Sequence, residues 1–332
     1  MKSDLNIIKL ELMELRFMKT ILIAGGAGFI GTNLCKRLLD EENRVICVDN
    51  FHTGKMRNIE DIESDNFKLI KHDIINPLEI PEKIDEIYNL ASPASPPYYQ
   101  AKPIQTIKTN IYGVINLLDL AVKNDAKFFQ SSTSEVYGEP LQHPQKETYW
   151  GNVNPNGIRS CYDESKRCAE SICMNYYHEY DAKIKIVRIF NTYGPYMDPN
   201  DGRVVSNFIN QCLRNENITI YGDGSQTRSF CYVDDLVEGF IRMMNMEDDF
   251  TGPVNLGNPG EFTILEFANK VISKIDTSSE IIYCDLPKDD PTQRKPDITL
   301  AMEKLNWKPQ IMFDEGLDRT IEYYQSLLEK NK

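Results

Sequence analysis

Gly25-Gly26-Ala27-Gly28-Phe29-Ile30-Gly31 directly follows an apolar run at residues 20–24 and opens a helix-like stretch at residues 29–40. The spacing Gly25-x-x-Gly28-x-x-Gly31 supplies glycine where a tight turn, a close approach of backbone to pyrophosphate and close helix-strand packing are needed. A glycine triplet alone is a weak signal, but this one lies between a strand and a helix, which makes it much stronger. The segment therefore predicts a dinucleotide site, with Phe29 and Ile30 among its contacts.

Further strands and helices alternate along the first half of the chain. We expect strands at residues 44–48, 67–71, 86–90, 127–131 and 185–189. Apolar strands separated by helices indicate a parallel sheet covered on both faces, so the expected fold class is α/β, a Rossmann-type doubly wound sheet. The alternation breaks after about Asn191. We expect an N-terminal extension (1–17), a Rossmann domain (18–190) and a smaller C-terminal α/β part (191–332), mainly substrate-binding, from which segments can return to the first domain.

Polar residues follow the strands at their carboxyl ends. Asp49 closes the second strand, where its carboxylate can accept hydrogen bonds from an adenosine ribose. The same charge repels a 2′-phosphate, so NAD is favoured over NADP. We expect the rest of the cofactor site in the segments that follow the second, third and fourth strands, at Asn50, Asp73, Ile74, Leu90 and Ser92.

Tyr162 and Lys166 form the Tyr-x-x-x-Lys pair of short-chain dehydrogenases. Residues four apart share one face of a helix, so the ammonium of Lys166 is expected to lower the pKa of Tyr162 and to let a phenolate accept a hydroxyl proton. The pair is common by chance. It becomes convincing here because residues 131–135 (SSTSE) end the preceding strand and the glycine motif lies upstream.

From Met18 onward the chain resembles the UDP-glucuronate decarboxylase (UDP-xylose synthase) family of extended short-chain dehydrogenases/reductases. The matching segments are residues 90–98 (LASPASPPY), 132–138 (STSEVYG), 188–195 (RIFNTYGP), 201–208 (DGRVVSNF), 224–230 (GSQTRSF), 255–259 (NLGNP) and 289–297 (DDPTQRKPD). Several are substrate-loop motifs, which bear on chemistry as well as on fold. The resemblance implies oxidation of a UDP-sugar at C4 by NAD, loss of carbon dioxide and re-reduction.

The resemblance also implies roles for single residues. Tyr162 is the expected base at O4, Thr133 orients that hydroxyl, and Lys166 holds the nicotinamide ribose. Glu135 and Arg228 are expected at C5 and C6 of the sugar, where a guanidinium can bind a carboxylate bidentately. The expected contacts to the nucleotide, which with Arg228 make up the substrate site, are Lys108, Arg203, Arg294, Asn191 and Tyr221.

Other activities share the first oxidation. The main alternative is a nucleotide-sugar 4,6-dehydratase, which typically carries Asp after the threonine; here that position is Ser134, a poor proton donor to a leaving hydroxyl. A 4-epimerase has little use for Glu135 and Arg228. A decarboxylase that stops at the 4-keto-pentose is compatible with the motifs. An inactive NAD-binding sensor is disfavoured because Thr133, Tyr162 and Lys166 are all retained.

Composition narrows the partners. A net charge of −13 disfavours nucleic acid and anionic membranes. No apolar run approaches the roughly 18 residues of a membrane span, so a cytoplasmic protein is expected.

Eight cysteines and four histidines are scattered without ligand spacing, so no metal site is expected. Helices at 110–123 and 162–180 are apolar on more than one face, which favours a homodimer over burial inside a monomer.

Overall fold

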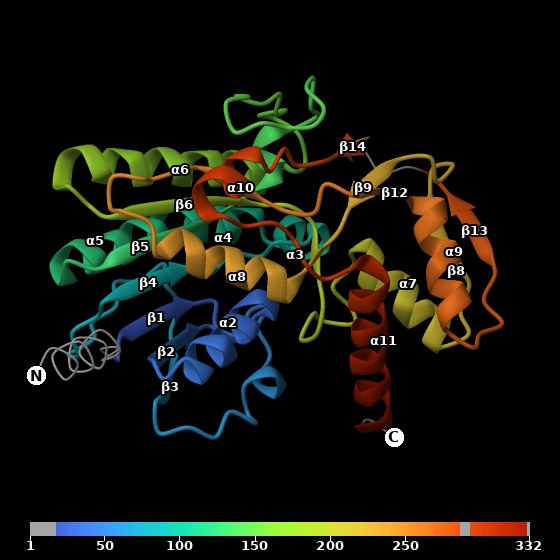
Figure 1. Ribbon diagram of the computed structural model, residues 1–332, viewed down its shortest axis with the longest axis horizontal. Helices are drawn as coiled ribbons and strands as arrows, with labels where there is room; N and C mark the ends of the chain where they lie inside the picture. The colour runs from blue at the N-terminus through green and yellow to red at the C-terminus, as the bar shows by residue number, and fades with distance from the viewer. Residues whose placement is uncertain (1–17, 286–292, 331–332) are drawn as a thin grey trace, which may run out of the picture.

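The computed structural model describes residues 18–285 and 293–330, so the expected extension at 1–17 lies outside the described residues. Its centre is a parallel sheet of seven strands in the order β11-β6-β5-β4-β1-β2-β3 (Figure 1). The strands are β1 (Thr20–Ala24), β2 (Arg44–Asp49), β3 (Phe67–Lys71), β4 (Glu86–Asn89), β5 (Lys127–Thr133), β6 (Ile184–Ile189) and β11 (Val254–Leu256). This order confirms the expected Rossmann-type α/β class.

Helices cover both faces of this sheet because its strands are apolar on both sides. Ile21 and Ile23 of β1 belong to a core shared with α2 (Phe29–Asp40) and α8 (Val233–Met244). Leu22 and Ala24, one residue out of phase, belong to a second core shared with α5 (Val114–Asn124) and α6 (Ser160–Tyr180). Successive side chains of a strand point to opposite faces, so a four-residue apolar run serves both cores.

The helix expected at 110–123 is interrupted. The chain forms α4 (Pro103–Lys108), one π-helical turn η2 (Thr109–Gly113) and then α5. A Cβ at Gly113 would lie 2.5 Å from the Ile74 side chain, so glycine lets this turn approach the loop after β3. The turn directs Asn110 toward α6, where its amide donates to the Ser165 hydroxyl at 2.8 Å. Single π-turns of this kind often occur at functional sites.

The C-terminal elements gather beside the carboxyl ends of the strands (Figure 1). They are α7 (Val204–Leu213), β8 (Ile218–Tyr221), β9 (Thr227–Ser229), β12 (Glu261–Thr263), α9 (Ile264–Lys274), β13 (Ile281–Cys284), β14 (Gln293–Arg294) and α11 (Phe313–Lys330). The remaining short elements are η1 (Met56–Asn58), α3 (Pro96–Ala101), η3 (Ser134–Tyr137), β7 (Thr192–Tyr193), β10 (Cys231–Tyr232) and α10 (Thr299–Leu305). Two segments from this half, α8 and β11, pack on or pair with the large sheet.

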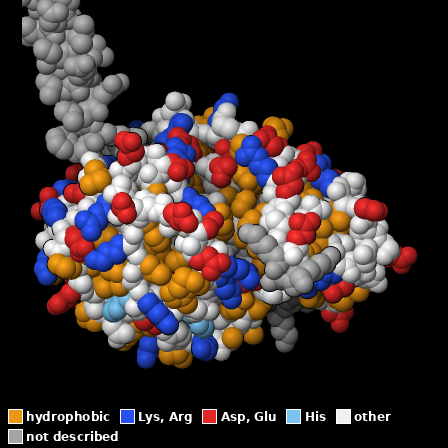
Figure 2. All heavy atoms as spheres, turned by 90° about the horizontal axis from the view of Figure 1, so that it is seen from below, with side chains coloured by type: hydrophobic (Ala, Val, Ile, Leu, Met, Phe, Trp, Pro, Cys, Tyr) orange, Lys and Arg blue, Asp and Glu red, His pale blue; other side chains and the backbone are white. Residues whose placement is uncertain are grey.

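The surface carries charges of both signs. Acidic and basic side chains are interspersed over the face shown in Figure 2, with hydrophobic side chains exposed between them. Within the described residues, no helix combines the length and apolar character that crossing a bilayer requires.

The glycine turn after β1 is sterically demanding. Gly25 has φ +81°, in the left-handed region, and a Cβ there would lie 2.9 Å from Ala91 backbone atoms. A Cβ at Gly31 would lie 2.1 Å from the Gly25 carbonyl oxygen. These two glycines let the first turn of α2 pack directly against the end of β1.

Replacing Gly31 with Ala should therefore lower the free energy of unfolding by about 1–3 kcal/mol, the usual cost of overpacking, because the obstacle is backbone. Denaturant unfolding measures the change. Gly260→Ala is the matched control, since the new Cβ would meet only the Asn258 side chain at 3.2 Å. Equal stability of both variants would show that the turn relaxes without cost.

Candidate active site

A cavity of about 610 Å³ lies at the carboxyl ends of the parallel strands and is lined by the sheet on one side and the C-terminal elements on the other. This is the place where open α/β sheets bind ligands. Every cofactor residue expected from the sequence lines it: Gly25, Gly28, Phe29, Ile30, Gly31, Asp49, Asn50, Asp73, Ile74, Leu90, Ser92, Tyr162 and Lys166.

The N-terminus of α2 forms one end of this cavity. Its N-cap is Gly28, so no side chain caps the first backbone N–H groups. A Cβ at Gly28 would meet only the Gly25 carbonyl oxygen, at 3.2 Å, so no other described atom crowds this end of the helix. Uncapped N–H groups and the positive end of the helix dipole suit a phosphate.

Asp49 has a structural part as well as the expected binding part. One carboxylate oxygen accepts from the Ala27 N–H at 3.0 Å and the other from the Phe51 N–H at 2.8 Å. Burial raises the pKa of Asp49, and these two N–H groups oppose the shift. Because each carboxylate oxygen has more than one acceptor site, Asp49 can hold the glycine turn and still accept from a ribose hydroxyl.

The loop after β3 is joined to its neighbours through Asp73. Its carboxylate accepts from the Asn50 amide at 3.1 Å, the Gln105 amide at 3.2 Å and the Ile75 N–H at 3.1 Å. Asn50 and Asp73, expected as separate contacts, are thus one hydrogen-bonded pair on the cavity wall.

Tyr162 and Lys166 lie in the first turns of α6, both buried. The Tyr162 ring stacks on Tyr99 of α3, with 5.0 Å between ring centroids and 7° between planes. The Thr133 side chain, at the end of β5, hydrogen-bonds with Tyr162. The Lys166 ammonium donates to the Ser131 carbonyl at 2.8 Å, and burial lowers its pKa to about 8.

The expected lowering of the Tyr162 pKa by Lys166 is wrong for the chain by itself. Burial raises the pKa of Tyr162, and the hydrogen bond with Thr133 is the largest opposing influence. The Lys166 nitrogen lies 5.8 Å from the centre of the Tyr162 ring and is directed to the Ser131 carbonyl. The spacing of four residues placed the two side chains on one face, but it could not include the cost of burying a phenolate.

Glu135 lies beside this pair, in the short helix that follows β5. Its Oε2 accepts from Arg159 at 2.6 Å and from Arg294 at 3.1 Å. Burial raises the pKa of Glu135, but the charges of Arg294, Arg159 and Arg228 outweigh it and lower the pKa to about 2. Glu135 is therefore ionised at neutral pH and cannot be a resting proton donor.

Arg294, an expected nucleotide contact, lines the cavity but is also bound to the loop after β5. It is 1% exposed, and one guanidinium nitrogen donates to the Ser134 and Gly138 carbonyls at 3.1 and 2.8 Å while another donates to Glu135. Strand β14 runs parallel to β9 and pairs Arg294 with Arg228. Arg294 therefore belongs to the Glu135 cluster, because both of its terminal guanidinium nitrogens donate to the loop after β5.

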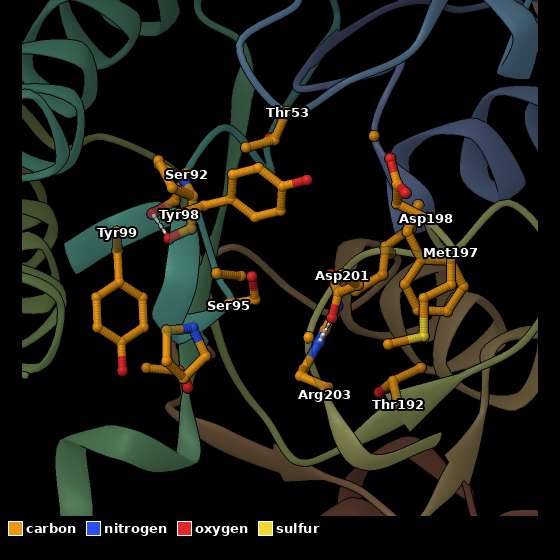
Figure 3. A pocket seen from close by; sticks show the side chains of 18 of the residues that line it. Thr53, Ser92, Ser95, Tyr98, Tyr99, Thr192, Met197, Asp198, Asp201 and Arg203 are labelled. Carbon is orange, nitrogen blue, oxygen red and sulfur yellow. Dashed lines mark hydrogen bonds and ion pairs between the residues drawn. The ribbon is translucent and has the colours of Figure 1, made fainter. Parts of the chain in front are cut away.

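The other expected nucleotide contacts divide. Asn191, Arg203, Tyr221 and Arg228 line the cavity. Lys108 is exposed at the end of α4 and is absent from the lining, so its contact with the nucleotide stays a prediction. Arg203 forms a bidentate ion pair with Asp201, drawn in Figure 3 on the opposite side of the cavity from Tyr98, Tyr99, Ser92 and Ser95.

Three residues beside the Tyr162 and Lys166 pair escaped the sequence reasoning, and of these only Arg159 lines the cavity. Arg159 is the N-cap residue of α6, Asp163 follows Tyr162, and Asn110 comes from the π-turn. Arg159 and Asp163 flank the Tyr162–Lys166 motif, which was a usable signal. Asn110 gave none, since the π-turn is not visible in the hydrophobic pattern.

A dinucleotide cradle, a buried Tyr162 and Lys166 on one helix, and Thr133 at the end of β5 together define an extended short-chain dehydrogenase/reductase. A family model described as GDP-mannose 4,6 dehydratase matches residues 22–320. UDP-glucuronic acid decarboxylase 1 of Arabidopsis thaliana is 52% identical over 307 residues, covering 92% of this chain and 70% of that protein. The Danio rerio protein of the same name is 51% identical, covering 94% and 74%.

Solved structures give the same picture. The UDP-glucuronic acid 4-epimerase of Bacillus cereus, in complex with UDP-glucuronic acid and NAD, has a TM-score of 0.84 at 29% identity and covers 93% of this chain and 99% of that one. The UDP-glucose 4-epimerase of Thermotoga maritima, with UDP-glucose, has a TM-score of 0.85 at 30% identity, with the same coverage. Because it is 51–52% identical to these decarboxylases over most of its length, this chain belongs to the UDP-glucuronic acid decarboxylase family.

Glu135→Gln should expose the electrostatics of the cluster. A folded-state pKa near 2, against about 4.3 in an unfolded chain, stabilises the fold fully above pH 4.3, and this stability is lost as pH falls toward 2. At pH 7 the variant should be less stable by about 3–5 kcal/mol, the usual cost of breaking a buried pair. The deficit should shrink below pH 4.3.

Denaturant unfolding between pH 7 and pH 3 measures both effects. Glu164→Gln, which removes a half-exposed carboxylate paired with Arg167, should change stability by less than about 1 kcal/mol. A Glu135→Gln deficit that does not vary with pH would contradict an ionised, arginine-held Glu135.

Proposed function

We propose that this chain is an NAD-dependent carboxy-lyase that converts UDP-glucuronate to UDP-xylose through a UDP-4-keto intermediate. The observation that carries the proposal is the position of Glu135, ionised and held by Arg159 and Arg294, directly beside Tyr162 and Thr133. An oxidation site and a site built from carboxylate and guanidinium groups thus share one cavity. Relatives at about half identity carry the matching name.

The residues present fit NAD. The bare N-terminus of α2 suits its pyrophosphate, and Asp49 suits an adenosine ribose while disfavouring a 2′-phosphate. When bound there, NAD would supply the hydride acceptor for C4 of the sugar and, after loss of carbon dioxide, the hydride donor.

Tyr162 is the group that moves a proton at O4. The Tyr162 hydroxyl is buried and hydrogen-bonded with the Thr133 side chain, and this bond fixes its orientation toward the sugar hydroxyl. Tyr162 can accept this proton only as a phenolate, a form that burial opposes and that the positive charge of an oxidised nicotinamide bound beside it would favour. Lys166, whose ammonium is positioned by its hydrogen bond to the Ser131 carbonyl, would hold the nicotinamide ribose. On return of the hydride, Tyr162 gives the proton back to O4.

Oxidation makes the carboxylate beta to a ketone, so the electrons of the breaking C5–C6 bond pass into an enolate. Arg228 lines the cavity and can bind that carboxylate. Glu135 stays ionised and therefore disfavours a second carboxylate charge close by, which favours loss of neutral carbon dioxide. C5 then takes a proton from water.

For the nucleotide, Arg203, Asn191 and Tyr221 line the cavity. Arg203 already pairs with Asp201, so a diphosphate that binds Arg203 competes with a carboxylate two residues away. Tyr221 is 46% exposed and offers an aromatic ring on which the nucleotide base can stack.

The dehydratase alternative lacks support, because Ser134 is buried and no carboxylic acid stands at its position.

Purified protein given UDP-glucuronate and catalytic NAD should release carbon dioxide and form UDP-xylose, identified by mass and NMR, without net NADH. Tyr162→Phe should lower kcat by about 10²–10⁴-fold, the usual worth of a general base. Tyr177→Phe, on the same helix but outside the cavity lining, should leave kcat unchanged.

The products separate the alternatives. A 4-keto-pentose with stoichiometric NADH would retain decarboxylation and remove the final reduction. Failure to release carbon dioxide, with a 4-keto-6-deoxy product from a nucleotide-glucose, would overturn the proposal in favour of the dehydratase.

A second copy of this chain is the partner that the apolar faces of α5 and α6 fit. Tyr112, Val122 and Tyr180 are 53%, 39% and 52% exposed, and all belong to the adjoining elements η2, α5 and α6. These helices match the regions expected to form a homodimer. Pairing them with their copies would remove this apolar surface from water.

Light scattering should therefore give twice the mass of one chain. Val122→Glu should weaken the dimer at least about tenfold, because an unpaired charge would be buried at the interface. Met312→Glu, at a residue 73% exposed just before α11, is the matched control and should leave the mass unchanged. A monomeric wild-type chain would reject the dimer without touching the catalytic proposal.

A further inference from the structure

Behind Glu135 lies a second buried carboxyl group that the reaction does not use. Asp163 is 7% exposed in the first turn of α6, immediately after Tyr162. One of its carboxyl oxygens, Oδ1, is buried with no hydrogen-bond partner. Asp163 does not line the cavity, so it has no direct path to a substrate.

Its surroundings come from four elements. Glu135 of η3, Arg159 at the start of α6 and Arg294 of β14 act on Asp163 by charge, as does the neighbouring Glu164. Tyr99 of α3 belongs to the same cluster: its hydroxyl is also buried without a hydrogen-bond partner, and the Asp163 charge acts on it. The Asp163 charge also raises the pKa of Cys161, which is 6% exposed, and that of Tyr162.

An ionised Asp163 would be costly in this place. A buried carboxylate oxygen without a hydrogen bond costs several kcal/mol, and a second carboxylate beside Glu135 adds repulsion. The α6 dipole favours ionisation by only about 0.3–1 kcal/mol at an exposed site and about 2 at most. The two arginines favour it too, but both already donate to Glu135. Of the two carboxyl groups, Glu135 therefore keeps the charge.

We propose that Asp163 is a positioning residue that stays a neutral carboxylic acid while the enzyme works and so leaves Arg159 and Arg294 directed to Glu135. When Asp163 ionises, it competes for the same guanidinium groups, and Glu135 loses its single orientation beside Tyr162. The inference deepens the proposed function and rests on it for its kinetic consequence. Burial and the Glu135 charge raise the pKa of Asp163 to about 8, within reach of ordinary alkaline conditions.

Asp163→Asn tests the idea, because asparagine has the shape of the neutral acid and cannot ionise. Wild-type kcat should fall about tenfold per pH unit above pH 8, as for loss of one essential proton. The variant should keep kcat near the wild-type value at pH 7 and retain it above pH 8. Glu179→Gln, at an exposed residue near the other end of α6, should keep the wild-type pH profile.

The outcomes are distinct. A loss of kcat in Asp163→Asn at every pH would mean that the ionised form is required, and an unchanged alkaline limb would mean that Asp163 does not set it; both overturn the proposal. Wild-type protein without decarboxylase activity at any pH would instead reject the proposed function. Unfolding of each variant shows whether a loss comes from the fold.

Infrared spectroscopy of the unaltered protein gives a readout that needs neither activity nor a variant. With ¹³C in the aspartate carboxyl groups, a protonated aspartic acid should be seen at pH 7 and should disappear as pH rises through about 8. If all aspartates are ionised at pH 7, the proposal is wrong.

Discussion

The site depends on the hydrogen bonds of the Arg294 guanidinium. This side chain comes from the C-terminal half, yet its partners are the Ser134 and Gly138 carbonyls and the Glu135 carboxylate, all just after β5. The pairing of β14 with β9 places Arg228 alongside. Arg294 is 1% exposed. A buried, charge-assisted hydrogen bond of this kind is strong only if both the guanidinium and the carboxylate are held in position. The two halves of the chain therefore have one orientation in which the cavity is complete.

Local chemistry explains why much of this fold could be predicted. The Gly25–Gly31 turn needs particular backbone conformations and close contacts, and the six sheet strands that were expected are short, largely apolar runs, so both can be recognised within a few residues of sequence. The seventh strand, β11, was not expected. The residues expected to contact the cofactor follow the strand ends directly, and all of them line the cavity. Thr133, Tyr162 and Lys166 were found through motif and spacing.

Contacts between distant segments could not be obtained in this way. Lys108 and Arg294 were both expected to contact the nucleotide, but Lys108 is exposed outside the cavity lining, and Arg294, which lines the cavity, also holds the Glu135 loop. Arg159, which completes that cluster, lies 24 residues from its partner Glu135. The pKa of Tyr162 was misjudged because spacing describes distance along a helix and says nothing about burial.

The large sheet is finished by a strand from late in the chain. β11 (Val254–Leu256) pairs with β6, which ends at Ile189, so some sixty residues of the other half intervene before the edge is covered. During synthesis on a ribosome at roughly 5–20 residues per second, β6 therefore remains an open apolar edge for seconds. Such an edge is a template for wrong pairing with other chains. A chain that ends before residue 256 keeps the β6 edge exposed permanently. Chaperones and proteases can recognise that exposed apolar edge and remove the incomplete chain.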